Sequence, residues 1–223
     1  DYVGCDVSRG MGYGYNGNLI DAIGCGNWAN PIVGNPPAVG IDLIKGPFLA
    51  ADGLDNSSTT NLDTAFYLGG GPYPSLGVGY GDGIIDNERM GLSKFVYFDG
   101  QLPQNSFGDP TNAIQYYNYM RGYWRDNTRF AFGASGNASS NGATSIPTDY
   151  CFPGDSDPLN WGTVSAGIGS PGIDTVPYSD WSEQSPAGIG SNSNVVGDRR
   201  VLLSVGPMSY FPLDTIELTL AVV

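Results

Sequence analysis

The chain of 223 residues contains no histidine. This absence excludes a Ser-His-Asp triad, a His-Cys dyad and any zinc site with histidine ligands. Basic residues are also scarce: nine Lys and Arg stand against 22 Asp and Glu, which gives a formal net charge of −13. So negative a chain disfavours contact with nucleic acid or with anionic lipid surfaces. We therefore expect no nucleic-acid partner.

Long hydrophobic runs are missing too, so we expect no membrane insertion. No signal peptide is visible, and the sequence starts at Asp1 rather than at a methionine. A mature or excised segment of a longer or processed protein fits this pattern.

Cysteine is limited to Cys5, Cys25 and Cys151, which allow one disulfide and one remaining thiol. A Cys5–Cys25 bond would contribute about 3 kcal/mol in an oxidising compartment. The alternative is three buried thiols that behave as small apolar side chains.

Aromatic and glycine residues are abundant, with 14 Tyr, 9 Phe, 4 Trp and 34 Gly. The aromatics indicate a folded core, and the glycines indicate long turn-rich connections. We predict one mainly β domain over residues 1–223, an antiparallel β-sandwich-like fold with long Gly/Asn/Ser-rich loops and one α-helix. Residues 1–100 form its irregular part with acidic turns, and residues 101–223 hold the helix and the C-terminal strands.

Local patterns place the individual elements. Strands are predicted at 39–44, 94–98 and 201–205, and a strict apolar–polar alternation predicts another over 216–222. The helix is predicted at about 110–125, with Asp109 as its cap and Pro110 in its first turn. Residues at helical spacing are Ile114, Tyr117, Met120 or Arg121, and Trp124.

Aspartate dominates the acids: only Glu88, Glu183 and Glu217 are glutamates. Many aspartates lie in turns flanked by Gly and Asn, where short carboxylates can surround a hard cation such as Ca²⁺. We predict one or two Ca²⁺ ions, with ligands drawn from Asp42, Asp52, Asp55, Asp82, Asp86, Asn87, Glu88, Asp155 and Asp157. The alternative is a set of Asx-turns without metal, since Asp and Asn favour turns in any case.

Exposed aromatic side chains would allow sugar binding. Trp161 and Trp181, with Trp124 and the tyrosine-rich run 116–123, are candidate ligand-binding residues, although such residues more often pack in cores. Asp180 and Glu183 beside Trp181 also permit a glycosidase carboxylate pair, whose separation the sequence does not give.

Several stretches together resemble a recurrent extracellular region of large secreted Bacteroidota proteins exported by the type IX secretion system. They are residues 1–6 (DYVGCD), 37–42 (PAVGID), 46–48 (GPF), 81–89 (GDGIIDNER), 116–122 (YYNYMRG), 152–158 (FPGDSDP), 198–200 (DRR) and 204–207 (SVGP). The resemblance covers nearly the whole chain and implies an extracellular or cell-surface location. That family has no settled activity to carry over.

Two departures from the family accompany the resemblance. The chain has Pro212-Leu213-Asp214 where the family has Pro-Gly-Asp, and no C-terminal sorting domain follows.

Asp-Thr-apolar triplets at Thr64, Thr175 and Thr215 are similar to the O-glycosylation signal of this phylum.

These observations favour a secreted structural or adhesive domain stabilised by calcium over any enzyme. Its expected partners are copies of itself, assembling as in a filament, neighbouring surface proteins, or glycans. The alternative function is a carbohydrate-binding module or an accessory domain of a glycoside hydrolase.

Overall fold

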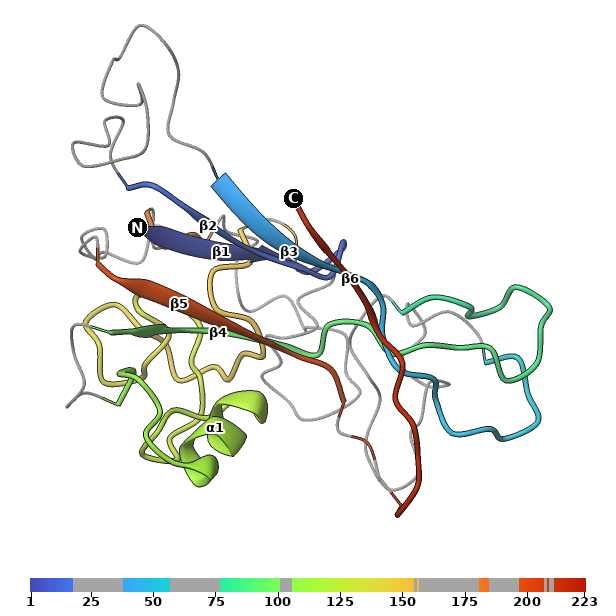
Figure 1. Ribbon diagram of the computed structural model, residues 1–223. Coiled ribbons are helices and arrows are strands. Elements are labelled where there is room, and N and C mark those ends of the chain that lie inside the picture. Colours follow the sequence, from blue (N-terminus) through green and yellow to red (C-terminus); the bar gives the residue numbers. More distant parts are fainter. Residues whose placement is uncertain are drawn as a thin grey trace, which may run out of the picture.

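The computed structural model describes residues 1–17, 38–56, 77–100, 106–154, 156, 181–184, 197–206, 208 and 211–223. Within these residues the chain is mainly β, with two antiparallel sheets and a single short helix (Figure 1). This arrangement confirms the predicted β-sandwich-like fold class.

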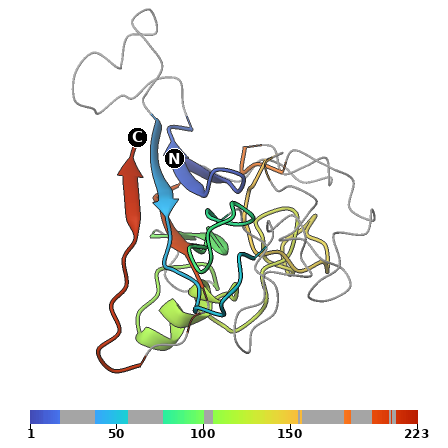
Figure 2. The ribbon, with the colours of Figure 1, turned by 90° about the vertical axis from the view of Figure 1, so that its right-hand side faces the viewer.

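The larger sheet has four strands in the order β1-β2-β3-β6. They are β1 (Tyr2–Asp6), β2 (Met11–Tyr15), β3 (Ala38–Lys45) and β6 (Thr219–Val222). Every neighbouring pair is antiparallel, so Cys5, Gly12, Ile41 and Val222 lie in one row across the sheet. Figure 2 shows β6 at the outer edge, next to β3.

The smaller sheet pairs β4 (Lys94–Asp99) with β5 (Arg199–Ser204). It packs against β1 and β2 of the larger sheet. The approach is closest at Gly12, where an added Cβ would lie 2.7 Å from Phe95 and 2.8 Å from Leu203. Only glycine fits between the sheets at this point.

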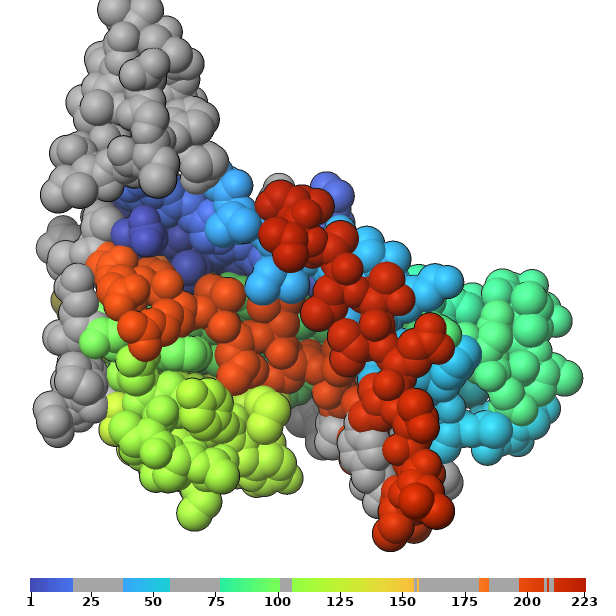
Figure 3. All heavy atoms as spheres, in the orientation of Figure 1, coloured from blue at the N-terminus to red at the C-terminus, as the bar shows by residue number. Residues whose placement is uncertain are grey.

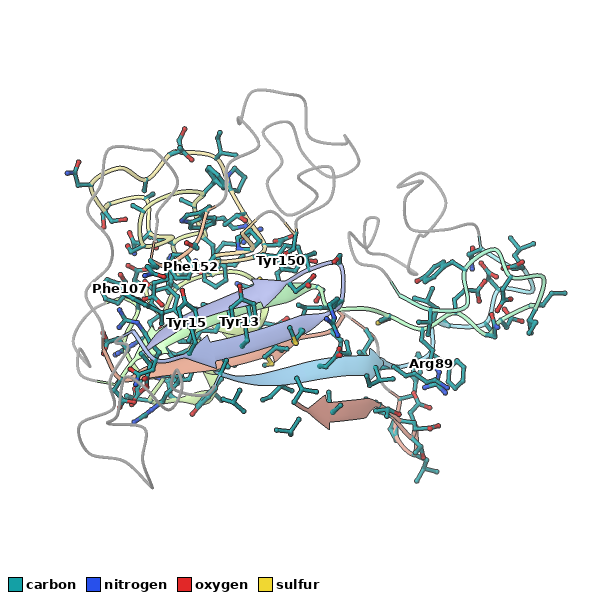
Figure 4. The ribbon with its side chains drawn as sticks, turned by 90° about the horizontal axis from the view of Figure 1, so that it is seen from above. Tyr13, Tyr15, Arg89, Phe107, Tyr150 and Phe152 are labelled. Carbon is teal, nitrogen blue, oxygen red and sulfur yellow. The ribbon has the colours of Figure 1, made fainter. Side chains whose placement is uncertain are left out.

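An aromatic core fills the space beside β4. Trp124 contacts the rings of Tyr97, Phe107, Tyr119 and Phe130, at centroid distances from 4.8 to 6.2 Å. The buried members of this core include Phe95, Tyr97, Phe98, Tyr119, Trp124, Phe130, Tyr150, Phe152 and Trp181. Phe107, Tyr150 and Phe152 are labelled in Figure 4. Burial of these large rings is the main source of stability.

The helix α1 (Ala113–Met120) is shorter than predicted and begins later. Its cap is Asn112, whose side chain accepts from the Gln115 amide at 3.1 Å, whereas Asp109 forms an ion pair with Arg200. It ends because Gly122 takes a left-handed φ of +85°, which directs Trp124 into the core. Ile114 and Tyr117 point outward, and Tyr119 is the buried aromatic.

The strands differ in how well the sequence predicts them. Those predicted at 39–44, 94–98 and 201–205 are confirmed as β3, β4 and β5. The alternation over 216–222 forms a strand only at β6. Strands β1 and β2 occupy a segment that the sequence indicates as irregular, because their glycines carry little strand signal.

No helix among the described residues is long and apolar enough to cross a membrane.

Candidate functional site

Two acidic turns far apart in sequence meet in one projection of the molecule, which we call the double loop (residues 47–56 and 77–89). Backbone bonds join its two segments: Leu49 N–H donates to Glu88 O at 2.9 Å, and Asp86 N–H donates to Leu54 O at 3.1 Å. Figure 1 shows the double loop projecting beyond the ends of the sheets, on the side away from α1. The sequence predicts both turns but not their contact.

Close backbone approaches fix the base of the double loop. A Cβ on Gly46 would lie 2.0 Å from the Met90 carbonyl oxygen, and one on Gly77 would lie 2.0 Å from that of Arg89. The Arg89 guanidinium stacks on Phe48 at 3.7 Å and donates to Gly46 O at 3.1 Å. Figure 4 shows Arg89 at the junction between the sheet and the double loop. The base therefore tolerates no larger side chain at these glycines.

Carboxylates cross-link the two segments. Asp86 Oδ1 accepts from the amides of Asp52 and Gly53, at 2.7 and 2.9 Å. Asp55, on the first segment, accepts from amides of the second segment, those of Gly81 and Gly83, at 2.8 and 2.6 Å. Asp86 adopts a left-handed φ of 58°, which Asp tolerates better than most residues.

The other acids of the double loop bond locally or at its base. Asp52 accepts from the Leu54 amide, while Asp82 accepts from the Ile84 amide and from Asn87 Nδ2, each at 2.9 Å. Glu88 is only 2% exposed and accepts from the Asn56 amide. Each carboxylate thus satisfies backbone or side-chain donors, which is the chemistry of Asx-type turns.

The double loop retains oxygen atoms that these bonds do not use. Asp52, Asp86 and Glu88 each have one such carboxylate oxygen, and the buried Oδ1 of Asn87 has no hydrogen-bond partner among the described residues. However, no group of three acidic residues in the described part of the chain converges closely enough to hold a metal. Ca²⁺ binding would therefore require these side chains to move closer together.

The remaining predicted metal ligands are not part of this arrangement. Asp42 lies in β3, in register with Ala221, and makes none of the cross-loop bonds. Asp155 and Asp157 lie outside the described residues. The metal ligand set stays a prediction.

Trp181 does not match its predicted role in sugar binding. It is 0% exposed, packs on Phe132 and Phe152, and donates its indole N–H to Ala134 O at 3.1 Å. A side chain enclosed in this way cannot stack on a sugar. Trp161 and Asp180 lie outside the described residues.

A buried charge network lies beside the aromatic core, and the sequence does not predict it. Glu183 is fully buried, where it accepts from the Val3 amide at 2.8 Å and pairs with Arg199 at 2.7 Å. Arg199 also pairs with Asp99. Burial raises the pKa of Glu183, while Arg199 and the Val3 amide oppose that rise. The sequence gives one hint of this network: glutamate is rare in the chain, and Glu183 lies close to Trp181.

The predicted disulfide partner Cys25 lies outside the described residues. Cys5 is buried, with its Sγ 3.6 Å from the Cys151 carbonyl oxygen. Burial also raises the pKa of the Cys151 thiol, which keeps it protonated at neutral pH.

Of the three predicted glycosylation sites, Thr215 is exposed, while Thr64 and Thr175 lie outside the described residues.

No protein-family model, curated protein or solved structure matches this chain.

Proposed function

We propose that the chain is a secreted or cell-surface structural or adhesive domain, and that calcium stabilises its double loop. The observation that supports this most directly is that five acids, Asp52, Asp55, Asp82, Asp86 and Glu88, belong to one projecting unit, although they do not yet surround a common point. Arg89 is the one basic residue in these two segments. A divalent cation would offset the repulsion between the carboxylates.

The ion would act on local stability. Because the carboxylates already cap amides, binding would be weaker than at a preformed site, and we expect a millimolar rather than a nanomolar requirement. Ion concentrations of that order occur outside cells, and extracellular calcium modules bind in roughly the 10⁻⁴–10⁻³ M range.

Differential scanning calorimetry with 5 mM CaCl₂ or with EDTA tests this proposal. We expect calcium to raise the Tm of the wild type and to lose that effect in the Asp52→Asn/Asp86→Asn variant, which keeps side-chain acceptors but removes two charges. Asp214→Asn, at an exposed turn outside the double loop, removes one charge without changing these carboxylates and is the control. If calcium leaves the Tm of the wild type unchanged, the proposed role of the ion is wrong.

Protease treatment of intact producing cells tests the location separately. Cleavage of the chain without cell lysis, or its recovery from the medium, is the expected result. Retention inside the cells would reject the extracellular role.

Carbohydrate binding stays a second candidate because of exposed aromatics on α1. Tyr116 and Tyr117 are exposed, and the Arg121 guanidinium lies 4.9 Å from the rings of both Tyr117 and Tyr123. Binding on a glycan array that Tyr117→Ala abolishes would support this role, and no binding to any glycan would retire it.

A further inference from the structure

One half of the inner face of the larger sheet has no covering layer among the described residues. Val3 and Cys5 of β1 point into the core on this face. The same face continues across β3 and β6 through Ile41 and Val222, which are in register with each other. Both are exposed, Val222 by 77%, because β4 and β5 pack on β1 and β2. Figure 3 shows the C-terminal segment on the surface beside β3.

The outer edge of β6 carries backbone groups that point away from β3. Gly40 and Val223 exchange two hydrogen bonds, of 2.8 and 3.0 Å. Because such pairs alternate along an antiparallel ladder, Leu220 and Val222 direct their N–H and C=O groups to the opposite side. No described strand pairs with β6 on that side.

This edge lacks the features that usually prevent strand addition. Residues 218–223 contain no charged residue, proline or glycine, although proteins commonly place such residues on exposed edges. The exposed apolar side chains on the inner face of β3 and β6 are Val39, Ile41, Leu220 and Val222, whereas Val223 lies on the opposite face against Gly40. Their exposed apolar area is on the order of 400 Å², in the range of patches that mark interfaces.

We propose that this surface binds a second copy of the chain, with the two β6 strands pairing antiparallel about a two-fold axis at Ala221. In this register Leu220 of each copy faces Val222 of the other, and the two residues exchange both of their outward hydrogen bonds. The small side chain of Ala221 lies at the axis, where the strands approach most closely. The two four-stranded sheets become one continuous sheet of eight.

The β6 edge is a part of the surface where two copies can meet without placing charged side chains opposite each other. The chain carries a net charge of −13, so two copies repel each other over most of their surfaces. In the proposed register Thr219 faces Val223, and no charged residue of either β6 lies opposite its copy. Association should therefore strengthen with salt, since screening weakens the repulsion and leaves the apolar contact.

Sedimentation equilibrium of the 223-residue chain tests the proposal. We expect the mass to double between about 1 and 500 µM, at lower concentration in 0.5 M than in 0.05 M NaCl. Val222→Lys should weaken association at least tenfold, although it reduces the negative charge that makes two copies repel each other. Ile114→Lys makes the same charge change on α1 and should leave association intact. A single-copy mass at every concentration and salt would overturn the proposal.

Hydrogen exchange of the wild type gives a readout that does not depend on any variant. The amides of Leu220 and Val222 should become protected as concentration rises, whereas that of Val223, already bonded to Gly40, should change little. Association without new protection at Leu220 and Val222 would reject the strand pairing.

This inference deepens the proposed structural role and depends on it, but its test does not involve calcium. Doubling of the mass with no calcium effect on Tm keeps the interface and rejects the ion. A calcium effect on a chain that stays single keeps the ion and rejects the interface.

Discussion

The aromatic core and the double loop are stabilised by different interactions. In the core, rings such as Trp124 and Phe130 are removed from water and contact one another. In the double loop, the apolar residues Leu54, Ile84 and Ile85 are exposed, and carboxylate–amide hydrogen bonds connect the segments. The core therefore depends on the apolar area that it buries, and the double loop on hydrogen bonds between aspartate carboxylates and backbone amides. We expect the double loop to open locally while the core stays folded.

The sharpest test of the core is Trp124→Ala, which should destabilise the chain by about 3–5 kcal/mol through the cavity it leaves. Tyr117→Ala, at an exposed position on α1, should cost less than about 1 kcal/mol. Urea denaturation followed by fluorescence measures both. Equal costs would show that burial does not separate the two positions.

Adjacent arginines on β5 test whether charge also matters inside the core. Arg199 is buried with Glu183 and Asp99, so Arg199→Met should cost about 3–5 kcal/mol. Arg200 makes exposed pairs with Asp109 and Asp198, so Arg200→Met should cost at most about 1 kcal/mol. The same denaturation experiment compares them, and a reversed order would contradict the assignment of Arg199 to the core.

In the double loop, Asp86→Ala should cost about 1–2 kcal/mol, because the amides of Asp52 and Gly53 lose their acceptor. The effect should be local, with faster hydrogen exchange in residues 52–54 and an unchanged rate at Phe95 in the core. Asp86→Asn keeps an acceptor and tolerates the positive φ, so its effect should be smaller. Equal acceleration at Phe95 would mean that the two regions unfold together.

The smallest expected effect concerns pH. Since burial raises the pKa of Glu183 above its ordinary value of 4.5, the folded state binds this proton more tightly than the unfolded chain does. This contribution to stability is present below pH 4.5 and is lost as pH rises toward the raised value. The Glu183→Gln variant has no such titratable proton. As pH rises through this window, the free energy of unfolding of the wild type, measured in urea titrations, should therefore fall relative to that of the variant. A stability difference that stays constant across that window would refute the shift.

Those parts of the fold with strong local patterns can be predicted from sequence. Lys94–Asp99 is rich in aromatic and β-branched residues, and β3 has a short apolar run, so both are recognisable as strands. The Gly-Tyr segment of β2 is not, because its Gly12 serves close contact with Phe95 and Leu203 across the sheets. That contact involves residues distant in the sequence and leaves no local signal.

The candidate site shows the same division. The turn chemistry of residues 52–55 and 82–88 is visible in the sequence, whereas the cross-loop bonds from Asp86 and Asp55 depend on tertiary structure. The burial of Trp181 and Glu183 is hidden for a related reason, since neither composition nor spacing reveals which side chains the fold encloses.

The pairing of β3 with β6 also determines how long β3 stays without its neighbour during synthesis of the chain. Val222 lies about 180 residues after Ile41, its neighbour in the sheet. At a synthesis rate of roughly 5–20 residues per second, β3 waits on the order of ten to forty seconds for that neighbour. During this interval Ile41, Asp42 and Leu43 have no strand on that side, so this edge of β3 stays open until β6 has been synthesised.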